Sequence, residues 1–563
     1  MMISSNKKGV QLIVNQCVKQ GMKHVVCSPG SRNAPFVIAF DEHPDITCYV
    51  IHDERSAAFF ALGLAQMLDA PVGIVCTSGS ASLNYYPAVA EAYYQCIPLV
   101  VITADRPVEW VDQGDGQTIV QKDVYKNHIR YACQFSENPQ NEDEVWYIER
   151  EMAIAFSEGT SAWKGPIHFN VAFTEPLYGT TEIESQRGRI IERIKGEFHL
   201  SSKQAVQVIE SLECQKILVI CGQLPPDEGL FKELHFFAEN SAIAVLVENT
   251  SNLVDMKFIH CIDRTLNSID ENEMESYAPD LLITIGGAVV SKKIKAFIRK
   301  NKPKQHWKVG YDFPYMDTFQ SLTHSFETNP TSFFKELNLL TYKKNLSNFG
   351  AKWKQKDFMA QEKMPAFFET VPFSDISAIE TILDYVPESA NLHMSNSSIV
   401  RYCQLFDPIK SIRYWSNRGT SGIDGSSSTA VGAAALGEQL HVLITGDVSF
   451  FYDSNALWNQ YLNSNLRIVL INNFGGAIFK IIPGPNSSKQ LEKYFEAKHE
   501  QNAAQICKAF NIAYFSASTK EDIENQMSDF YSYEENGRPK LIEVFTPSDI
   551  NHLQLDAFFK AIK

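Results

Sequence analysis

The stretch that decides the fold is HVLITGD (441–447), which is followed by YDSNALWNQYL (452–462) and LRIVLINNFGG (466–476). Two runs of branched apolar residues flank a helix-like segment, as in a unit of two parallel strands joined by a helix. Because the carboxyl ends of adjacent parallel strands lie at one edge of a sheet, we expect Asp447 and Asn473 to meet there. Together with a backbone carbonyl from Gly475, their oxygens suit Mg²⁺ or Mn²⁺ on a diphosphate. The same residues also fit a helix cap and a turn, so the spacing alone leaves both interpretations open.

Short β-branched runs alternate with helix-like segments along the whole chain, which predicts an α/β fold with doubly wound parallel sheets. The charged stretch 180–203 shows no strand pattern and is typical of a linker, and the polar segment 342–374 marks a second boundary. We therefore predict three α/β domains, at residues 1–185, 200–342 and 375–563. The predicted strands are at 24–28, 47–51, 72–77, 98–104, 167–173, 216–222, 241–248, 280–287, 306–310, 391–395, 411–416, 441–447, 466–473 and 540–546.

The composition excludes several classes of protein. The chain has 563 residues, of which 44% are hydrophobic, so it can bury several cores and is not disordered. Its net charge of −15 and the lack of a long basic block argue against binding to nucleic acid or to an anionic membrane surface. Eleven scattered cysteines without a CxxC pair favour a reducing cytoplasm. No stretch approaches the ~18–20 apolar residues of a membrane span.

The Gly-Asp and Asn-Asn pattern is similar to the cofactor motif of thiamine diphosphate enzymes, in which Asp and Asn hold Mg²⁺ on the diphosphate. Val448 and Phe474 depart from the commonest form of that motif. With six further segments, the chain resembles one branch of the family, the 2-succinyl-5-enolpyruvyl-6-hydroxy-3-cyclohexene-1-carboxylate synthases of menaquinone biosynthesis. These segments are CSPGSRNAPF (27–36), HDERSAAFFALGLA (52–65), TSGSASLNYYPAVAEA (77–92), TADRPVEW (103–110), SNSSIVR (395–401) and SNRGTSGIDGSSSTAVG (416–432).

The resemblance implies a pyrimidine-binding, a central and a diphosphate-binding domain, with the cofactor held between subunits of a homodimer or homotetramer. It also implies a transferase of the carboligase type. Such an enzyme decarboxylates 2-oxoglutarate and adds the resulting succinic semialdehyde carbanion to isochorismate. Two alternatives stay open at this point: an acetolactate synthase-like or other 2-oxoacid decarboxylase of the same architecture, and a non-catalytic scaffold that binds the cofactor.

The resemblance also assigns roles to individual residues. Glu54 matches the glutamate that pairs with the aminopyrimidine N1′, although a carboxylate there would also complement the positive end of a helix capped by Asp53. The implied cofactor-binding residues, besides Glu54, are Thr77, Ser78, Ser397, Gly419, Ile423, Gly446, Asp447, Val448, Ser449, Asn473, Ile478 and Phe479.

The two substrates carry four carboxylates between them, and arginine binds carboxylates through two parallel hydrogen bonds. The implied substrate-site residues are Ser31, Arg32, Gln117, Asn396, Arg401, Arg418 and Lys292, with Lys293 as a looser match. For each cation the alternative is a solvated surface group or an ordinary salt bridge.

Overall fold

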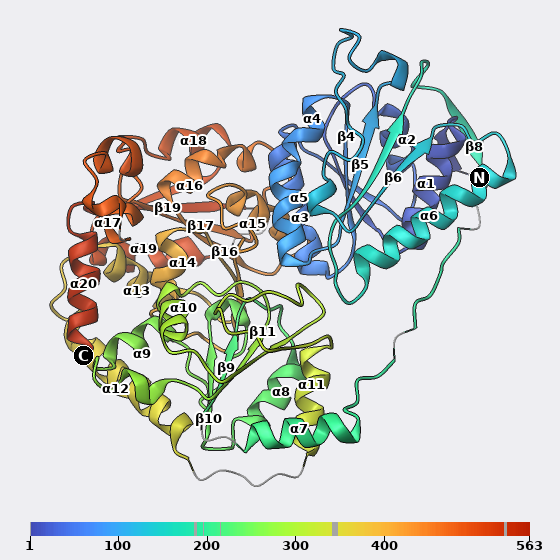
Figure 1. The fold of residues 1–563 in the computed structure, drawn as a ribbon. Coiled ribbons are helices and arrows are strands. Elements are labelled where there is room, and N and C mark those ends of the chain that lie inside the picture. The colour runs from blue at the N-terminus through green and yellow to red at the C-terminus, as the bar shows by residue number, and fades with distance from the viewer. Residues whose placement is uncertain are drawn as a thin grey trace. The chain divides into compact units, whose positions relative to one another are not determined.

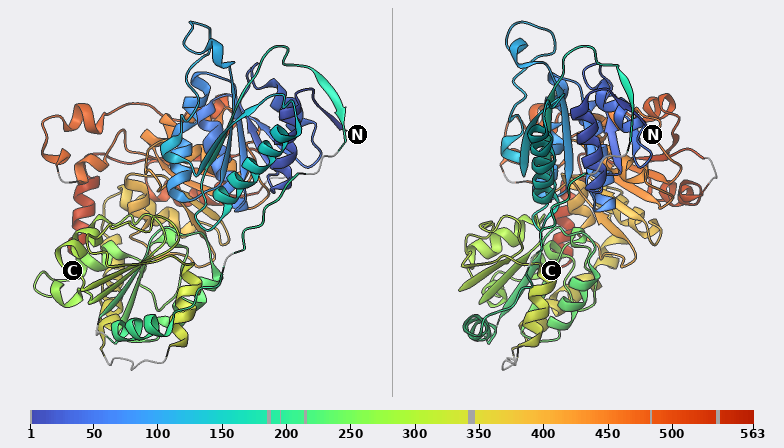
Figure 2. Two further views of the ribbon diagram at one scale, coloured as in Figure 1. Left: turned by 45° about the vertical axis from the view of Figure 1, so that its right-hand side comes forward. Right: turned by 90° about the vertical axis from the view of Figure 1, so that its right-hand side faces the viewer.

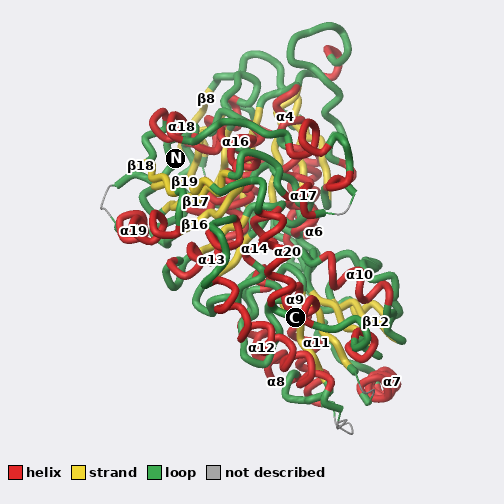
Figure 3. Tube along the Cα trace, turned by 90° about the vertical axis from the view of Figure 1, so that its left-hand side faces the viewer, coloured by secondary structure: helices red, strands yellow, loops and turns green. Residues whose placement is uncertain are grey.

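The computed structural model of the protein describes residues 2–184, 188–194, 196–213, 216–340, 347–482, 484–533 and 537–563. Strands and helices alternate along the chain (Figure 3). All described strands except β1 (Met2–Ser5) and β8 (Thr180–Ile183) belong to three parallel sheets. The predicted α/β fold with three doubly wound parallel sheets is therefore confirmed. Each sheet lies within one predicted domain range, but the boundaries themselves stay a prediction, and residues 185 and 342 lie outside the described residues. In the part of the chain that the structure describes, no helix is long and apolar enough to cross a bilayer.

The first sheet has helices on both faces (Figure 1). Apolar residues of α1 (Lys8–Lys19), α2 (Ala34–Asp41) and α6 (Glu142–Thr160) form a core with one face. The other face is covered by α3 (Glu54–Leu68), against which α5 (Tyr86–Gln95) packs. In sheet order the strands are β3 (Thr47–Val50), β2 (His24–Cys27), β4 (Val72–Cys76), β5 (Leu99–Asp105), β7 (Ile167–Ala172) and β6 (Tyr131–Ser136).

The second sheet is covered in the same way (Figure 2). One core holds residues of α7 (Ser202–Leu212), α8 (Glu228–Phe237) and α11 (Pro330–Leu339). The opposite core holds residues of α9 (Ile262–Ser268), α10 (Lys292–Lys300) and α12 (Phe349–Phe368). In sheet order the strands are β10 (Ile243–Val247), β9 (Ile217–Cys221), β11 (Leu281–Ile285), β12 (Gln305–Val309) and β13 (His324–Phe326).

The third sheet contains the stretches HVLITGD (441–447) and LRIVLINNFGG (466–476). Its core includes residues of α13 (Asp375–Tyr385), α14 (Ser398–Cys403), α19 (Lys520–Tyr531) and α20 (Asn551–Ala561). Strands β16 and β17 are neighbours in register, with Gly446 opposite Ile471, so their carboxyl ends lie together as predicted. In sheet order the strands are β15 (Arg413–Trp415), β14 (Asn391–Met394), β16 (His441–Gly446), β17 (Leu466–Asn472), β19 (Lys540–Phe545) and β18 (Ala513–Ala517).

The chain folds into two compact units, and both are discontinuous in sequence. Unit 1 comprises Met1–Lys195, Asn417–Glu438 and Phe451–Asn463, and unit 2 comprises the remaining segments. Within unit 1, α15 (Ser426–Ala434) packs against α3 so closely that the backbones of the two helices are in contact. A Cβ added at Gly63 would lie 2.1 Å from the carbonyl oxygen of Thr429, so only glycine allows the two backbones to approach so closely.

Two local predictions are wrong. Residues Thr180–Ile183, assigned to a linker without strand pattern, form β8, which pairs antiparallel with β1 (Met2–Ser5). The segment 452–462 is not a regular helix: α16 (Asp447–Tyr452) ends at its start, and a short 3₁₀ helix covers Ser454–Leu457. Tertiary contacts override helix propensity here, because the buried carboxylate of Asp453 accepts hydrogen bonds from the backbone N–H and hydroxyl of Ser428 at 2.8 and 2.9 Å.

Fully buried His168 on β7 predicts an acid-dependent loss of stability. Burial lowers the pKa of His168 from 6.5 to about 3, so the folded chain keeps the ring neutral while the unfolded chain protonates below pH 6.5. This contribution to stability is complete above pH 6.5 and decreases as the pH falls, by about 2 kcal/mol between pH 6.5 and 5. In urea denaturation followed by circular dichroism, we expect His168→Gln to remove about that much of the wild-type decrease. Substitution of the exposed His199 should leave the decrease unchanged; an equal effect of both would contradict this assignment.

Candidate active site

The predicted residues of unit 1 lie at the carboxyl edge of its sheet. Ser31 and Arg32 follow β2, and Glu54 follows β3. Thr77 and Ser78 follow β4, and Gln117 lies in the connection after β5. Ligands of open α/β sheets bind at this edge, because the loops after several strands meet there.

Glu54 is the first residue of α3, and the capping of this helix does not use it. The N-cap is Asp53, whose Oδ1 accepts from the N–H of Ser56 at 3.1 Å. Glu54 is half-buried, and its side chain has no hydrogen-bond partner among the described residues. Burial, and secondly the charge of Glu54, raises the pKa of the Cys76 thiol, which places the carboxylate near the end of β4. The carboxylate of Glu54 is thus available for a ligand.

The loops after β2 and β4 are in direct contact. A Cβ added at Gly30 would lie 2.4 Å from Cβ of Thr77, and the N–H of Arg32 donates to Oγ1 of Thr77 at 3.3 Å. The hydroxyl of Ser78 is buried and has no hydrogen-bond partner in the described part of the chain. An unpaired buried hydroxyl is costly unless a ligand pairs with it, so Ser78 fits a binding role.

Arg32 is influenced by the charge of a second arginine, which was not predicted from the sequence. Arg32 is buried and donates to the carbonyl of Phe173 at 3.0 Å, and its Nη2 lies 3.3 Å from Oε1 of Glu175. Burial, followed by the positive charge of Arg106, lowers the pKa of Arg32. Arg106 directly follows β5, and this position after a strand end could have identified it. Two neighbouring guanidinium groups suit a carboxylate ligand.

Gln117 is exposed, and its backbone packs against Gly79. A Cβ on Gly79, which has φ +83°, would lie 3.2 Å from Cα of Gln117, so a side chain at this position would be strained and crowded. The N–H of Gly79 donates to Oε1 of the buried Gln121 at 2.8 Å. Gln121, which the sequence analysis did not identify, thereby joins the loops after β4 and β5.

Arg418, Gly419 and Ile423 also belong to unit 1. Glu91, another residue that was not predicted, accepts from the backbone N–H groups of Gly419 and Thr420 at 2.7 and 2.6 Å. Arg418 is buried. Ile423 is 39% exposed, so within unit 1 it does not act as a core residue.

In unit 2, Asp447 lies at the end of β16 beside the turn that follows β17. Its Oδ2 accepts from the N–H of Gly475 at 2.9 Å, and its Oδ1 accepts from the N–H of Val448 at 2.6 Å. Nε2 of His499 lies 3.3 Å from Oδ2 of the same carboxylate. The nearby carboxylate of Asp447 raises the pKa of His499. His499 lies 52 positions beyond Asp447, and no sequence signal connected the two.

Asn473, at the end of β17, has a side-chain oxygen that is available to a ligand. Its Nδ2 donates to Oδ2 of Asp375 at 2.9 Å, while its Oδ1 is buried and has no hydrogen-bond partner within the described ranges. Burial, and more weakly the charge of Asp447, raises the pKa of Asp375 to about 6. An unpaired amide oxygen near two buried carboxyl groups is the donor set that a divalent cation satisfies.

These residues therefore fit Mg²⁺ or Mn²⁺ bound through few protein ligands. Among the described residues, no group of three or more His, Cys, Asp or Glu side chains could hold a metal ion. A cation here would complete its coordination with phosphate and water oxygens, as Mg²⁺ commonly does.

The other predicted cofactor residues of unit 2 line the same strand ends. Ser397 precedes α14 with φ +71°, a conformation that L residues rarely adopt and that is common at binding sites. The neighbouring Asn396 is buried. The N–H of Gly446 donates to Oγ of Ser395 at 3.3 Å, which connects β16 to this turn. The remaining predicted residues follow these strands: Val448 and Ser449 lie in α16, and Ile478 and Phe479, both half-buried, lie in α17 (Ile478–Ile481).

Arg401 is held by a loop of the central sheet. Its Nη1 donates to the carbonyl oxygen of Val290 at 3.2 Å. The backbone N–H groups of Val290 and Ser291 donate to the carboxylate of buried Glu248 at 2.7 and 2.8 Å. Glu248, which sequence reasoning missed, thereby fixes the loop that precedes Lys292.

The structure distinguishes the two lysines. Lys292 is exposed. Nζ of Lys293 lies 3.8 Å from the ring centroid of Phe559 and donates to Oδ1 of Asn267 at 2.6 Å. Lys293 is thus used in packing within unit 2, which favours Lys292 as the lysine available to a ligand.

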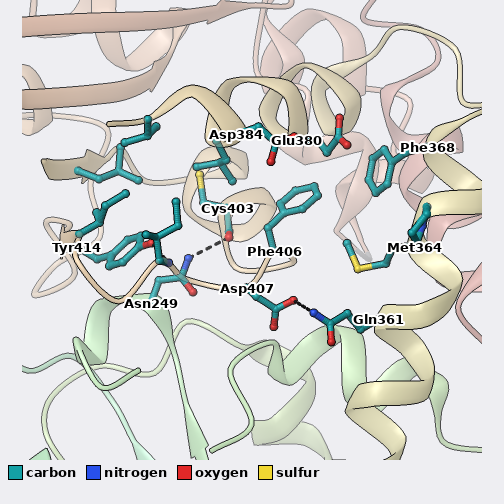
Figure 4. A pocket seen from close by; sticks show the side chains of 16 residues that line it. Asn249, Gln361, Met364, Phe368, Glu380, Asp384, Cys403, Phe406, Asp407 and Tyr414 are labelled. Carbon is teal, nitrogen blue, oxygen red and sulfur yellow. Dashed lines mark hydrogen bonds between the residues drawn. The ribbon is translucent and has the colours of Figure 1, made fainter. Parts of the chain in front are cut away.

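A separate cavity of unit 2 contains none of the predicted site residues. It has a volume of about 390 Å³ and lies among α12, α13 and the segment after α14 (Figure 4). Nδ2 of Asn249 donates to the carbonyl of Cys403 at 3.0 Å at its edge, and Gln361 donates to Asp407 at 3.0 Å. Its lining is mostly apolar.

Comparison with known families covers most of the chain. Residues 7–125 match the family described as thiamine pyrophosphate enzyme, N-terminal TPP binding domain. Residues 195–394 match the middle domain of thiamine pyrophosphate enzymes, and residues 397–544 match the C-terminal TPP binding domain. Benzoylformate decarboxylase from Polynucleobacter necessarius shares the fold, with a TM-score of 0.71, 15% identity and coverage of 97% of this chain and 99% of that chain.

Similar curated proteins extend over nearly the full length. A 2-succinyl-5-enolpyruvyl-6-hydroxy-3-cyclohexene-1-carboxylate synthase from Christiangramia forsetii is 46% identical, with 98% of each chain covered. Proteins of the same name from Flavobacterium psychrophilum and Bacteroides thetaiotaomicron are 43% and 37% identical, with 98% and 99% of each chain covered. The chain therefore belongs to the 2-succinyl-5-enolpyruvyl-6-hydroxy-3-cyclohexene-1-carboxylate synthase family of thiamine pyrophosphate enzymes.

Proposed function

We propose that this chain is a thiamine diphosphate-dependent transferase of menaquinone biosynthesis. It decarboxylates 2-oxoglutarate and joins the resulting four-carbon unit to isochorismate, which yields 2-succinyl-5-enolpyruvyl-6-hydroxy-3-cyclohexene-1-carboxylate and CO₂. The observation that carries this proposal is the full-length similarity, at up to 46% identity among the relatives given above, to synthases of that name. The positive charges of Arg32 and of Arg106, which lowers the pKa of Arg32, support it, because both substrates are carboxylates.

The residues at the strand ends fit the cofactor and its cation. Asp447, Asn473 and the carbonyl of Gly475 would bind Mg²⁺ or Mn²⁺, and this is supported by the unpaired oxygen of Asn473. Ser397, Gly446, Val448 and Ser449 would contact the diphosphate, with Gly419, Ile423, Ile478 and Phe479 along the rest of the molecule. Thr77 and Ser78 would contact the pyrimidine. When bound, thiamine diphosphate supplies the nucleophilic carbon and accepts the electron pair that decarboxylation releases.

The protein's own groups would position substrates and hold protons. The Glu54 carboxyl would hold a proton at the pyrimidine ring nitrogen. Arg32, Arg401, Arg418 and Lys292 would bind the substrate carboxylates, and fixed cations orient reacting carbons at little entropic cost. Ser31, Gln117 and Asn396 would add neutral hydrogen bonds that orient the substrates.

We also propose a homodimer or homotetramer in the cytoplasm. Three large side chains near Glu54 in unit 1 are exposed: Val50 (43%), Tyr452 (53%) and Trp458 (49%). Trp458 stacks on His52 at 4.9 Å, and Tyr452 lies 4.6 Å beneath the guanidinium of Arg55. Exposed aromatic residues of this kind are typical of subunit interfaces. The ten described cysteines are all free thiols, which supports a reducing compartment.

An assay of CO₂ release tests the function. We expect turnover with 2-oxoglutarate plus isochorismate, and its loss when thiamine diphosphate and Mg²⁺ are both left out. A clear preference for pyruvate would favour an acetolactate synthase-like or other 2-oxoacid decarboxylase and would overturn the proposal. Cofactor binding without turnover of any of these substrates would instead indicate a non-catalytic scaffold.

A further inference from the structure

Asp375 is a fully buried carboxyl group to which neither the motifs nor the family resemblance assigned a role. It is the first residue of α13, and its backbone N–H donates to Oδ1 of Asn551 at 2.9 Å. Its Oδ1 accepts from the hydroxyl of Thr546 at 2.5 Å, and its Oδ2 accepts from Nδ2 of Asn473 at 2.9 Å. Both side-chain oxygens therefore have donors, and Asn551 holds the backbone of the same residue.

This contact determines which way the amide of Asn473 points. A side-chain amide has a donor end and an acceptor end, and a carboxylate accepts only from the donor end. A reversed amide would place Oδ1 of Asn473 against Oδ2 of Asp375, oxygen to oxygen. With Nδ2 held by Asp375, Oδ1 faces away from it, and this is the oxygen that is buried without a hydrogen-bond partner among the described residues.

We propose that Asp375 is a positioning residue that presents Oδ1 of Asn473 to the divalent cation and thereby strengthens cation binding. This inference rests on the cation site of the proposed function. Asp375 acts through Asn473, from whose Nδ2 its Oδ2 accepts a hydrogen bond, and this role requires no contact between Asp375 and the cation. Outer partners that orient a metal ligand typically contribute 10- to 100-fold to metal affinity or activity.

The test measures Mn²⁺ binding directly. The dissociation constant of the full-length chain is determined by electron paramagnetic resonance of free Mn²⁺ at saturating thiamine diphosphate. We expect D375A to raise it by about tenfold or more. At saturating Mn²⁺, kcat of D375A should return to within about threefold of wild type, because occupancy of the site is then restored.

A matched control uses the other partner of the same carboxylate. T546V removes a buried hydrogen bond to Asp375 but keeps the contact with Asn473, so it should change the Mn²⁺ dissociation constant less than about threefold. The conservative D375N retains an acceptor for Asn473 and should recover most of the affinity lost in D375A. Wild-type affinity of D375A, or an equal loss in T546V, would overturn the proposal.

A double-mutant cycle separates positioning from a general structural effect. If Asp375 acts through Asn473, D375A should have no further effect on Mn²⁺ affinity in an N473A background, whereas additive losses would refute the mechanism. If D375A fails to fold, the same cycle is carried out with D375N, for which we expect a smaller loss that again disappears in N473A. The binding measurements contain no isochorismate. The Mn²⁺ dissociation constants therefore test the role of Asp375 even if the chain does not catalyse the proposed reaction.

Discussion

Replacement of Glu54 by glutamine is expected to lower kcat by about 10²- to 10⁴-fold, the range typical of a lost proton-transfer group. Glutamine has nearly the same shape but cannot hold an exchangeable carboxyl proton beside the pyrimidine nitrogen. Steady-state kinetics at saturating substrates measure the loss, and calorimetry measures thiamine diphosphate binding. The affinity should stay within a few-fold of wild type, because the anchoring groups at Asp447 and Asn473 are unchanged.

Asp53 offers a matched control at the same junction of strand and helix. Its side chain caps α3 and accepts from Asn455 at 2.7 Å. Asp53→Ala should lower stability by about 0.5–2 kcal/mol, as loss of an N-cap does, while kcat falls less than tenfold. Unchanged turnover of Glu54→Gln with intact cofactor binding would remove Glu54 from the chemistry.

Substitution of Asp447 by asparagine should raise the dissociation constant for Mn²⁺ by at least about 100-fold, since loss of a direct ligand exceeds the loss of an outer partner. Thiamine diphosphate should then bind weakly, because the cation joins its diphosphate to the protein. Without cation and cofactor the variant should be as stable as wild type or more stable, because it removes a charge that disfavours ionisation of the nearby Asp375. Thermal denaturation with and without Mg²⁺ and cofactor distinguishes the two effects. Wild type at ligand concentrations 100 times the dissociation constant gains about 2.7 kcal/mol, and the variant should gain almost nothing.

Asp453→Asn is the control for this prediction. Asp453 is also fully buried, and burial raises its pKa to about 6, but its partners are the N–H and hydroxyl of Ser428 in unit 1. Its substitution changes a buried carboxyl without touching the cation ligands, so the stabilisation by Mg²⁺ and cofactor should be kept. A variant of Asp447 that retains this stabilisation would exclude Asp447 as a ligand.

Most of the predicted strands differ in burial from the missed ones, whereas the edge strand β3 (TCYV) was predicted although it is only partly buried. Strands in the interior of the sheets, such as β17 (LRIVLIN), are buried along their length, so their sequences are nearly continuous apolar runs. The missed strands β6 (YACQFS), β13 (HSF) and β18 (AYFSA) lie at sheet edges and are only partly buried. Their mixed sequences resemble those of loops, and edge strands are therefore hard to identify from periodicity.

The residues of the candidate site also fall into a group that could be predicted from the sequence and a group that could not. Side chains directly after strands could be predicted, because the end of a strand fixes their position. Arg106 occupies such a place within the segment TADRPVEW (103–110), but the resemblance assigned no role to it. Glu91, Glu248 and Asp375 act through partners far along the chain, and Asp375 is 98 positions from Asn473. Contacts at such separations arise only from tertiary folding, and one sequence contains no periodicity or spacing that reveals them.

The discontinuity of unit 1 has a consequence for biosynthesis. Glu91 binds Gly419, 328 positions later, and α3 packs on a helix that begins at Ser426. During translation, the first 195 residues therefore leave the ribosome long before residues 417–438 and 451–463, which complete unit 1, are synthesised. Nascent domains, by contrast, generally fold in order from the N-terminus. The emerging polypeptide must keep the small-residue surface of α3 and the Glu91 carboxylate uncovered until residues 417–463 leave the exit tunnel. Prematurely terminated products would expose this surface permanently, which makes them natural clients of chaperones and proteases.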